Sequence, residues 1–270
     1  MEDVETWRAA RLSHLTSPGG WLSLVGLEWL REGENHLGSD PAADVRFPGG
    51  RAPADIGTIT VREGDVEFVA APGAGVMVDG HPVDRIGLRP TGRRPTVLRL
   101  GPIRFLVIER DGRYAVRIKD PESPVRTRFT GIEHWPVDLR WRFDARFEPR
   151  TDVMTAKVPA VVGPGEIYRL PGWLAFEHEG ETHSLEAFEE TPGEDFLVVF
   201  ADATSGIETY PGGRFVYVKP PDGDGMTALD FNKAYNPPCV FTPFATCPLP
   251  PPGNRLPFRV EAGEKEYRGT

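Results

Sequence analysis

The chain has 270 residues, of which 39% are hydrophobic and 26% charged, and it carries a formal net charge of -9 with a pI near 5.3. This balance is typical of a globular protein, and the excess of acidic groups argues against binding to nucleic acid or to an anionic membrane surface. No apolar run approaches the roughly 20 residues of a membrane-spanning helix, and the acidic N-terminus has the wrong sign for a secretory signal, so we expect a cytoplasmic protein.

Residues 1–30 are predicted to form an N-terminal helical segment. Glu2 to Leu15 has the apolar spacing of an amphipathic helix, and the Thr16-Ser-Pro-Gly-Gly20 run ends it. Trp21 to Leu30 is an apolar block with two tryptophans. We interpret this block as a helix that covers the edge of a sheet. The alternative is an exposed aromatic surface that docks a partner.

Residues 31–125 show the pattern of a β-sandwich. Short runs rich in β-branched residues are separated by glycine turns, as in antiparallel strands. The predicted strands are Gly57–Val61, Val66–Val69, Val76–Val78, Thr96–Leu100, Phe105–Ile108 and Tyr114–Ile118. Asp79–Gly80 and Asp111–Gly112 favour tight hairpins. Strands that recur at intervals of roughly ten residues predict a sandwich.

Two motifs in this region resemble those of a forkhead-associated domain in outline. Leu37–Phe47 is similar to the opening of that family, and Val78–Val83 is similar to its Asn-Gly turn. The resemblance implies a protein-interaction module. However, Ser39 stands where the family has a phosphate-binding arginine, and Ile56–Thr58 stands where it has a serine–histidine motif. Phosphothreonine would lack a charge-assisted partner here, so we expect no phosphothreonine recognition.

Residues 126–270 are predicted to form a continuous second β-sheet. Leu139–Phe147 alternates apolar and charged side chains, which places one face on the core and the other toward solvent. The other predicted strands are Val158–Val162, Gly172–His178, Thr182–Phe188, Phe196–Phe200 and Gly213–Val218, with a hairpin turn at Glu179–Gly180. The fold class is therefore mainly β, with an N-terminal helix, an antiparallel sandwich and a second sheet.

The segment Leu229–Cys239 is the most informative part of the chain. It contains an Asp, two Asn, a Tyr and a Cys, and two prolines stiffen its end. Short polar groups on a stiff backbone suit a preorganised binding or catalytic site. The same groups also suit a buried network that satisfies backbone amides. The sequence predicts the location and leaves both interpretations open.

The candidate site residues lie in and around this segment. Asp230 and Glu264 are candidate general bases, and Cys239 is a candidate nucleophile, although Cys239 also fits a small buried apolar position. The candidate ligand-binding residues are Arg214, Asn232, Tyr235, Asn236 and Arg255, and the wider constellation adds Asp202, Thr204, Tyr210 and Asn254. The arginines would pair with an anionic group of a polar small molecule.

The same segment carries a family resemblance. Asp230–Cys239, Cys247–Pro251 and Ala262–Lys265 resemble the bacterial and archaeal family known as domain of unknown function 1684. The resemblance continues upstream through Gly20–Leu27 and Phe129–Ile132. It implies one protein of a single family whose signature is the polar C-terminal segment, and it brings no particular activity with it.

We expect neither a metal nor a cofactor. His178 and His183 flank a predicted hairpin, but their spacing to a third ligand is not diagnostic of a metal site. The chain has no phosphate loop and no dinucleotide fingerprint. Cys239 and Cys247 are too few for a zinc site, and in a reducing compartment we expect free thiols.

Three functions are compatible with these patterns. The leading hypothesis is a polar small-molecule site, binding or catalytic, around Leu229–Cys239, which predicts a concave pocket. The second is an intracellular protein-interaction module without phosphothreonine recognition. The third is a structural or assembly protein without a ligand, which predicts that the signature residues are buried and bonded to one another. Whether the protein is an enzyme, and its oligomeric state, are left open by the sequence.

Overall fold

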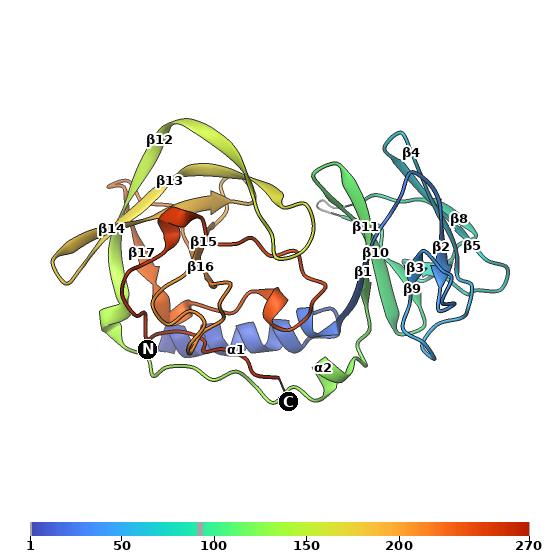
Figure 1. The fold of residues 1–270 in the computed structure, drawn as a ribbon, viewed down its shortest axis with the longest axis horizontal. Coiled ribbons are helices and arrows are strands. Elements are labelled where there is room, and N and C mark those ends of the chain that lie inside the picture. The colour runs from blue at the N-terminus through green and yellow to red at the C-terminus, as the bar shows by residue number, and fades with distance from the viewer. Residues whose placement is uncertain (1, 91–93, 270) are drawn as a thin grey trace. The chain divides into compact units, whose positions relative to one another are not determined.

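The computed structural model describes residues 2–90 and 94–269, and the chain divides into two compact units (Figure 1). The sandwich unit spans Leu15–Arg128, and the C-terminal unit joins Met1–His14 to Phe129–Thr270. The C-terminal unit is therefore discontinuous in sequence, and the N-terminal helix belongs to it rather than to a segment of its own. Across the described residues, no helix combines the length and apolar character needed to cross a membrane.

The apolar block at the start of the sandwich unit is a strand, so the helical interpretation of Trp21–Leu30 was wrong. Trp21–Ser23 forms a 3-10 turn, and Leu24–Trp29 forms β1. β1 pairs antiparallel with β11, Arg113–Lys119. The block thus completes the sheet with its own backbone instead of covering the edge with a helix. A short apolar run without helical periodicity is compatible with either element.

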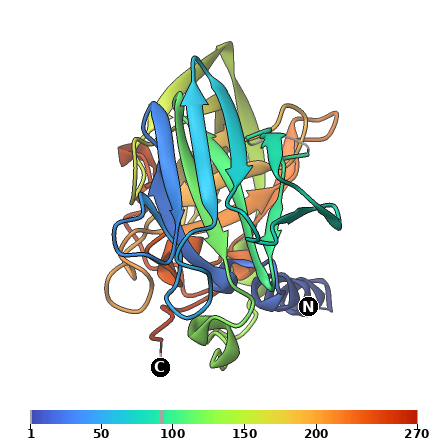
Figure 2. The ribbon, with the colours of Figure 1, turned by 90° about the vertical axis from the view of Figure 1, so that its right-hand side faces the viewer.

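Two sheets build the sandwich unit, as predicted. Their strand orders are β1-β11-β10-β9-β6-β7 and β3-β2-β4-β5-β8. The remaining strands are β2 (Gly33–Gly38), β3 (Val45–Arg46), β4 (Gly57–Arg62), β5 (Asp65–Ala70), β6 (Met77–Val78), β7 (His81–Pro82), β8 (Arg85–Gly87), β9 (Leu98–Leu100) and β10 (Ile103–Arg110). All pair antiparallel except β2 with β3. Figure 2 shows the long strands of this half lying side by side.

Buried side chains from both sheets share one apolar core. Within it the ring of Phe105 makes edge contacts with Phe47 and Phe68, at centroid distances of 5.1 and 6.1 Å. Both predicted hairpins are present, because Asp79–Gly80 and Asp111–Gly112 have positive φ at each residue, the backbone that a two-residue hairpin turn requires.

The last residues of the sandwich unit contact its first residues. The short helix α2, Pro124–Thr127, is capped by the Ser123 hydroxyl, which accepts a hydrogen bond from the Arg126 amide at 3.2 Å. The Arg126 guanidinium donates to the carbonyl oxygen of Thr16 at 2.8 Å. Residues far apart in sequence are thereby joined where the unit starts and ends.

The C-terminal unit contains one curled antiparallel sheet of order β16-β15-β14-β13-β12-β17. Its strands are β12 (Arg142–Val158), β13 (Glu166–His178), β14 (Glu181–Glu189), β15 (Phe196–Phe200), β16 (Arg214–Val218) and β17 (Met226–Asp230). Figure 1 shows β12 to β14 bending strongly. The register between β12 and β13 shifts between Pro149 and Met154, and such bulges increase curvature.

Two predicted strands of this unit have different bounds. Leu139–Trp141 is a 3-10 turn, so the alternating strand begins at Arg142. The predicted strand Val158–Val162 was wrong, because β12 ends at Val158 and only an isolated bridge joins Ala160 to Pro248. The sequence analysis also missed β17, which precedes the polar segment and positions it.

The helix α1, Glu2–Thr16, belongs to the C-terminal unit from Glu2 to His14. The rings of Trp7 and Tyr235 lie 6.1 Å apart, and the Lys233 ammonium pairs with Asp3. The helix therefore lies beside the polar segment that follows β17.

Lys119, at the end of β11, is a largely buried lysine in the sandwich unit. Its ammonium donates a hydrogen bond to the carbonyl oxygen of Gly19. Burial, together with the nearby charges of Arg117 and Arg104, lowers the pKa of Lys119 to about 8. The folded protein therefore releases this proton more readily than the unfolded chain does.

We predict that this lysine makes stability rise with pH above about 8. The unfolded lysine keeps a pKa near 10.5. Between about pH 8 and pH 10.5, the unfolded chain therefore binds a proton that the folded chain does not hold. The penalty for burying the charge is relieved progressively as the pH rises through this range. The measurement is urea unfolding of wild type and Lys119→Met at about pH 7 and about pH 10. Wild type should gain stability relative to the variant at the higher pH, and an unchanged difference would contradict the assignment.

Candidate functional site

The centre of the candidate region is the side chain of Arg214, on β16, which has no exposed surface. Its guanidinium donates hydrogen bonds to the carbonyl oxygens of Val260, at 2.9 Å, and of Ala262. It also donates to the Asp202 carboxylate at 3.4 Å. Burial lowers the pKa of Arg214, and Asp202 opposes the shift. Because a buried charge requires fixed partners, Arg214 ties the C-terminal segment to β16.

Asp202, directly after β15, is the acidic partner of Arg214 and also organises the turn that follows. Its carboxylate accepts hydrogen bonds from the amide of Val260 at 2.6 Å and from the hydroxyls of Thr204 and Ser205 at 2.9 and 3.3 Å. The acceptor positions of this carboxylate are therefore taken by the protein itself.

Glu264 closes the network on the other side and is completely buried. Its carboxylate accepts hydrogen bonds from the amide of Asn236 at 2.7 Å and from the guanidinium of Arg11 at 3.3 Å. Burial raises the pKa of Glu264, while Arg11 and Asn236 oppose the shift. Arg11 comes from α1, and the sequence analysis did not include it in the site. The available signal was an arginine on the otherwise apolar face of an amphipathic helix.

Asn236 and Tyr235 are also buried in this network. The Asn236 amide donates to the carbonyl oxygen of Lys265 at 2.7 Å, and its Oδ1 is buried without a hydrogen-bond partner in the described structure. The Arg11 guanidinium lies 4.5 Å from the ring centroid of Tyr235. Burial raises the pKa of Tyr235 well above its ordinary value, so its hydroxyl keeps its proton.

Asp230 and Asn232 form a separate local bracket. Asp230 accepts hydrogen bonds from the amide and the side chain of Asn232 at 3.0 and 2.9 Å. The Asn232 side chain also accepts from the amide of Asp138 and donates to its carbonyl oxygen, both at 2.9 Å. Every polar atom of Asn232 is used, as in a structural cap, and the bracket anchors the turn before β12.

Cys239 and Arg255 lie outside the network. Cys239 is half-buried, and its amide donates to the Cys247 sulfur at 3.2 Å. The Arg255 side chain is exposed. The residue before it, Asn254, is buried and bonds the backbone of Glu186 in both directions and the carbonyl oxygen of Val199. Asn254 thus bridges β14 and β15, while Arg255 turns outward.

The structure therefore brings together only part of the predicted set. Arg214, Asn236 and Glu264 converge, with Tyr235 beside them, and Arg11 and Asp202 complete the group. These side chains bond mainly to one another and to backbone groups of the segment 260–265. The buried part of the region is a polar network inside the protein, and a ligand does not reach Asn236 or Glu264 in this conformation.

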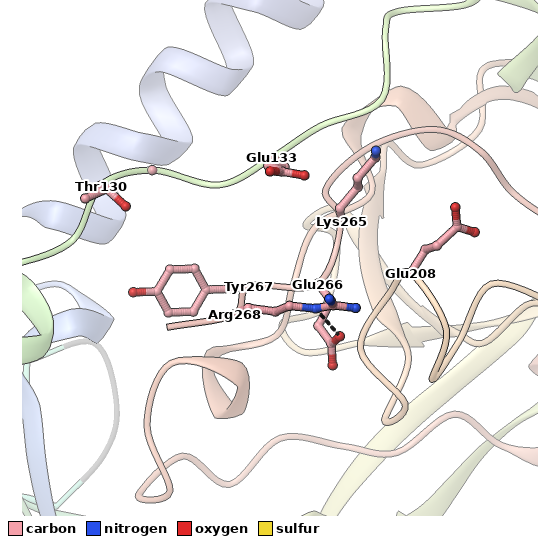
Figure 3. A pocket seen from close by; sticks show the side chains of 8 residues that line it. Thr130, Glu133, Glu208, Lys265, Glu266, Tyr267 and Arg268 are labelled. Carbon is pink, nitrogen blue, oxygen red and sulfur yellow. Dashed lines mark hydrogen bonds and ion pairs between the residues drawn. The ribbon is translucent and has the colours of Figure 1, made fainter. Parts of the chain in front are cut away.

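An open cavity lies where the network reaches the surface. It has a volume of about 350 Å³ and is lined by Thr130, Gly131, Glu133, Glu208, Lys265, Glu266, Tyr267 and Arg268 (Figure 3). The backbone holds this lining together, since the Lys265 amide donates to Glu133 and the Glu266 amide donates to Glu208, both at 2.8 Å. Half of the lining residues, Lys265 to Arg268, thus directly follow Glu264 in the chain.

The charges around the cavity are mixed. The Arg268 guanidinium pairs with Glu266 at 3.3 Å, and Glu208 pairs with Arg259. In Figure 3 the Lys265 side chain extends away from the Arg268–Glu266 pair. Its ammonium lies 5.3 Å from the ring centroid of Trp135. Lys265 therefore places a positive charge at the cavity on a rigid aromatic support.

The two histidines of the β13–β14 hairpin pack on an aromatic side chain. The rings of His178 and His183 lie 4.2 and 4.9 Å from that of Phe258 and 6.5 Å from each other. Within residues 2–90 and 94–269, no group of three histidine, cysteine or acidic side chains is arranged to hold a metal ion.

In the sandwich unit, Ser39 is turned toward the protein. Its hydroxyl donates to the carbonyl oxygen of Ala52 at 2.9 Å, and its amide donates to Pro53 at 2.9 Å. His81 is exposed on the short strand β7. The Ser39 hydroxyl is thus engaged with the backbone at the position where a forkhead-associated domain has its arginine.

We predict that Gly263 is essential for the path of the C-terminal segment. Its φ is +76°, and a Cβ there would lie 2.3 Å from the Ala234 carbonyl oxygen. Gly263→Ala should therefore lower the free energy of unfolding by about 2–4 kcal/mol. Gly253→Ala is the matched control, since a Cβ there meets nothing within 4 Å, and its effect should stay within about 0.5 kcal/mol. Urea unfolding measures both, and equal effects would show that the close approach is unimportant.

We also predict that substitutions of the two candidate arginines have very different effects on stability. Arg214→Met leaves Asp202 buried without its cation and should destabilise by about 3–5 kcal/mol. Arg255→Met removes an exposed charge and should change stability by less than about 0.5 kcal/mol. Thermal unfolding of both variants at one pH makes the comparison. A large loss for Arg255→Met, or a small one for Arg214→Met, would contradict the described network.

Comparison with solved structures gives similarities over parts of the chain. An uncharacterized protein from Haloarcula marismortui, solved in solution, is 31% identical, with a TM-score of 0.44 over 54% of this chain and 80% of that chain. An FHA domain studied for phosphothreonine-dependent interactions is 19% identical, with a TM-score of 0.25 over 34% of this chain and 92% of that chain. The FhaA FHA domain, solved with the intracellular domain of another protein, shows the same identity and TM-score over 34% and 97%.

Comparison with curated proteins gave no match. The sequence model of one family, described as protein of unknown function (DUF1684), matches residues 127–265. This range contains β12 to β17, Arg214 and the polar segment through Lys265. Because the match covers more than half of its residues, the chain belongs to the DUF1684 family.

Proposed function

We propose that the protein binds a small polar anion in the cavity beside Lys265. The observation that carries this proposal is that the segment 260–265, held by Arg214 and Glu264, brings Lys265 into the lining of an open cavity of about 350 Å³. A fixed cation next to a concave space is the feature that a binding site for a carboxylate or phosphate needs.

One positive charge supports an anionic ligand, since Lys265 lies in a lining whose other charged residues are three glutamates and one arginine. Trp135 has the Lys265 ammonium at 5.3 Å and the Arg214 guanidinium carbon at 5.4 Å from its ring centroid. Arg214 is compensated by Asp202, whereas Lys265 belongs to the lining of the cavity. Rigid support of a lysine on an aromatic ring reduces the ordering of the side chain that binding would otherwise require.

The size and the lining of the cavity limit the chemical class of the proposed ligand. The volume lies at the lower end of the range for small-molecule sites, so the ligand has the dimensions of a small metabolite. Glu133 and Glu208 supply carboxylates that accept hydrogen bonds from hydroxyl or ammonium groups. The proposed ligand is therefore a small carboxylate or phosphate that also carries a hydroxyl or amino group.

Binding is favoured over catalysis by the state of the candidate catalytic groups. The carboxylates of Asp230 and Glu264 already accept protein hydrogen bonds, and Cys239 is not among the residues that line this cavity. We therefore place Asp230 and Glu264 as supports of the site rather than as general bases.

A structural role is the second candidate, and one observation favours it. Arg214, Asn236 and Glu264 are fully buried and bond to segments far apart in sequence. This is expected of residues that fix the C-terminal segment in place, an arrangement that we call a clasp. The clasp and the binding site are compatible, but a clasp alone predicts that no ligand stabilises the protein.

The proposal also covers the binding partners and the cellular location of the protein. The net charge of -9 supports a cytoplasmic protein that binds neither nucleic acid nor an anionic membrane. The bonded hydroxyl of Ser39 supports an absence of phosphothreonine recognition in the sandwich unit.

The test is thermal unfolding with a panel of small carboxylates, phosphates and amino acids, with neutral polyols as the comparison. A ligand at about one hundred times its dissociation constant stabilises by about 2.7 kcal/mol, which raises the melting temperature by a few degrees. We expect at least one anionic member, and no polyol, to do so.

The matched variants are Lys265→Gln and Lys219→Gln, because Lys219 is an exposed lysine of the same unit. Lys265→Gln should abolish the stabilisation, and Lys219→Gln should retain it. A stabilisation that survives Lys265→Gln would reject the site, and an anionic panel without effect would leave the clasp as the function of the segment.

A further inference from the structure

Two cysteines meet in the C-terminal unit, although they are not consecutive. Cys239 lies in the 3-10 turn Pro238–Val240, which begins with Pro238 and is preceded by Pro237. Its amide donates a hydrogen bond to the Cys247 sulfur at 3.2 Å, and the two thiols are hydrogen-bonded to each other. The backbone of Cys247 is fixed in turn, because its carbonyl oxygen accepts from the Val161 amide at 2.9 Å. The Cys247 sulfur therefore lies directly beside Cys239, and both residues are on stiff backbone.

A tyrosine completes the group. The Tyr210 hydroxyl is hydrogen-bonded to the Cys239 thiol. A tight turn holds the phenol, since the Gly213 amide donates to the Tyr210 carbonyl oxygen at 3.0 Å. The ring packs on Gly212, where a Cβ would lie only 2.4 Å from a ring carbon. The turn thus needs glycine at this position to place the phenol against the sulfur.

The two thiols differ in accessibility. Cys239 is half-buried, whereas Cys247 is 4% exposed. Cys239 is therefore the cysteine that a small reagent from solvent reaches more easily.

The hydrogen bonds also favour the thiolate at Cys239. Hydrogen bonds from Cys247 and from Tyr210 lower the pKa of Cys239, against the effect of burial. Burial raises the pKa of Tyr210, so the phenol keeps its proton and stays a donor at neutral pH. A thiolate is the reactive form of cysteine toward oxidants.

We propose that Cys239 is an oxidation site for small peroxides and that Cys247 is its resolving thiol. The carrying observation is the juxtaposition of an accessible thiol, a buried thiol and a phenol donor on three stiff segments. This pair is separate from the cavity at Lys265 and is independent of the proposed ligand.

The chemistry balances with a hydroperoxide as the only added reactant. The Cys239 thiolate attacks one peroxide oxygen, so an S–O bond forms while the O–O bond breaks, and the departing alkoxide or hydroxide takes a proton from solvent. The Cys247 thiolate then attacks the Cys239 sulfur, an S–S bond forms, and hydroxide leaves and takes up the proton that Cys247 released. Two thiols are oxidised, and one peroxide is reduced to an alcohol or water together with a water molecule.

The experiment uses the full chain with hydrogen peroxide as the probe at neutral pH. Remaining thiols are alkylated at set times, and peptide mass spectrometry follows both cysteines. We expect one intramolecular Cys239–Cys247 disulfide per chain, a mass loss of about 2 Da, and full reversal by dithiothreitol. In Cys247→Ser, the expected product is a sulfenic acid at Cys239 that dimedone traps.

Rates give the independent readout. Native protein should react about tenfold faster than the same protein unfolded in urea, because unfolding removes the hydrogen bonds to the thiolate. Tyr210→Phe should slow the reaction about threefold or more while the melting curve shows that it is folded. A native rate no higher than the unfolded rate overturns the proposal. Oxidation that begins at Cys247, or that yields only disulfides between chains, also overturns the proposal. If Tyr210→Phe does not fold, the native-to-unfolded comparison decides alone.

Discussion

Burial of the Arg214 charge is the constraint on which the C-terminal unit depends. An interior guanidinium needs acceptors at fixed positions, and here they are Asp202 and the carbonyl oxygens of Val260 and Ala262. To present those carbonyls, the chain must run closely past β16. Gly263 then takes a left-handed conformation against the Ala234 carbonyl and sends Glu264 inward to Asn236 and Arg11. The position of Lys265 at the cavity follows from this path.

Much of the fold was predictable because local patterns determine it. The hairpins at Asp79–Gly80 and Asp111–Gly112 follow from residues that tolerate positive φ, and alternation predicted the sheet faces. Trp21–Leu30 could not be assigned in this way, since its strand pairing depends on β11, far along the chain. Strand β17 was missed because it is short and leads directly into the polar segment.

The structure brings together only part of the candidate set, and the roles of these residues as a site stay predictions. Arg214, Asn236 and Glu264 do converge, yet their partners are backbone carbonyls and Arg11, which no spacing rule connects to them. Asp230 and Asn232 have the composition of a ligand site and form a structural bracket, because carboxylate and amide groups serve both purposes equally well. Arg255 was expected in the site but is exposed. Its neighbour Asn254 is buried instead, so the arginine side chain remains outside.

The discontinuity of the C-terminal unit also bears on how the chain assembles during synthesis. Arg11 and Glu264 are separated by 253 residues, and joining such distant points in a flexible chain carries a loop-closure entropy that grows with length. The sandwich unit is complete when the ribosome has added Arg128, and its Arg126–Thr16 contact then closes the intervening loop. Its early folding would tether α1 to the nascent strand β12 and shorten the effective search. We therefore expect early folding of the sandwich unit to speed the folding of the other unit, whatever it binds.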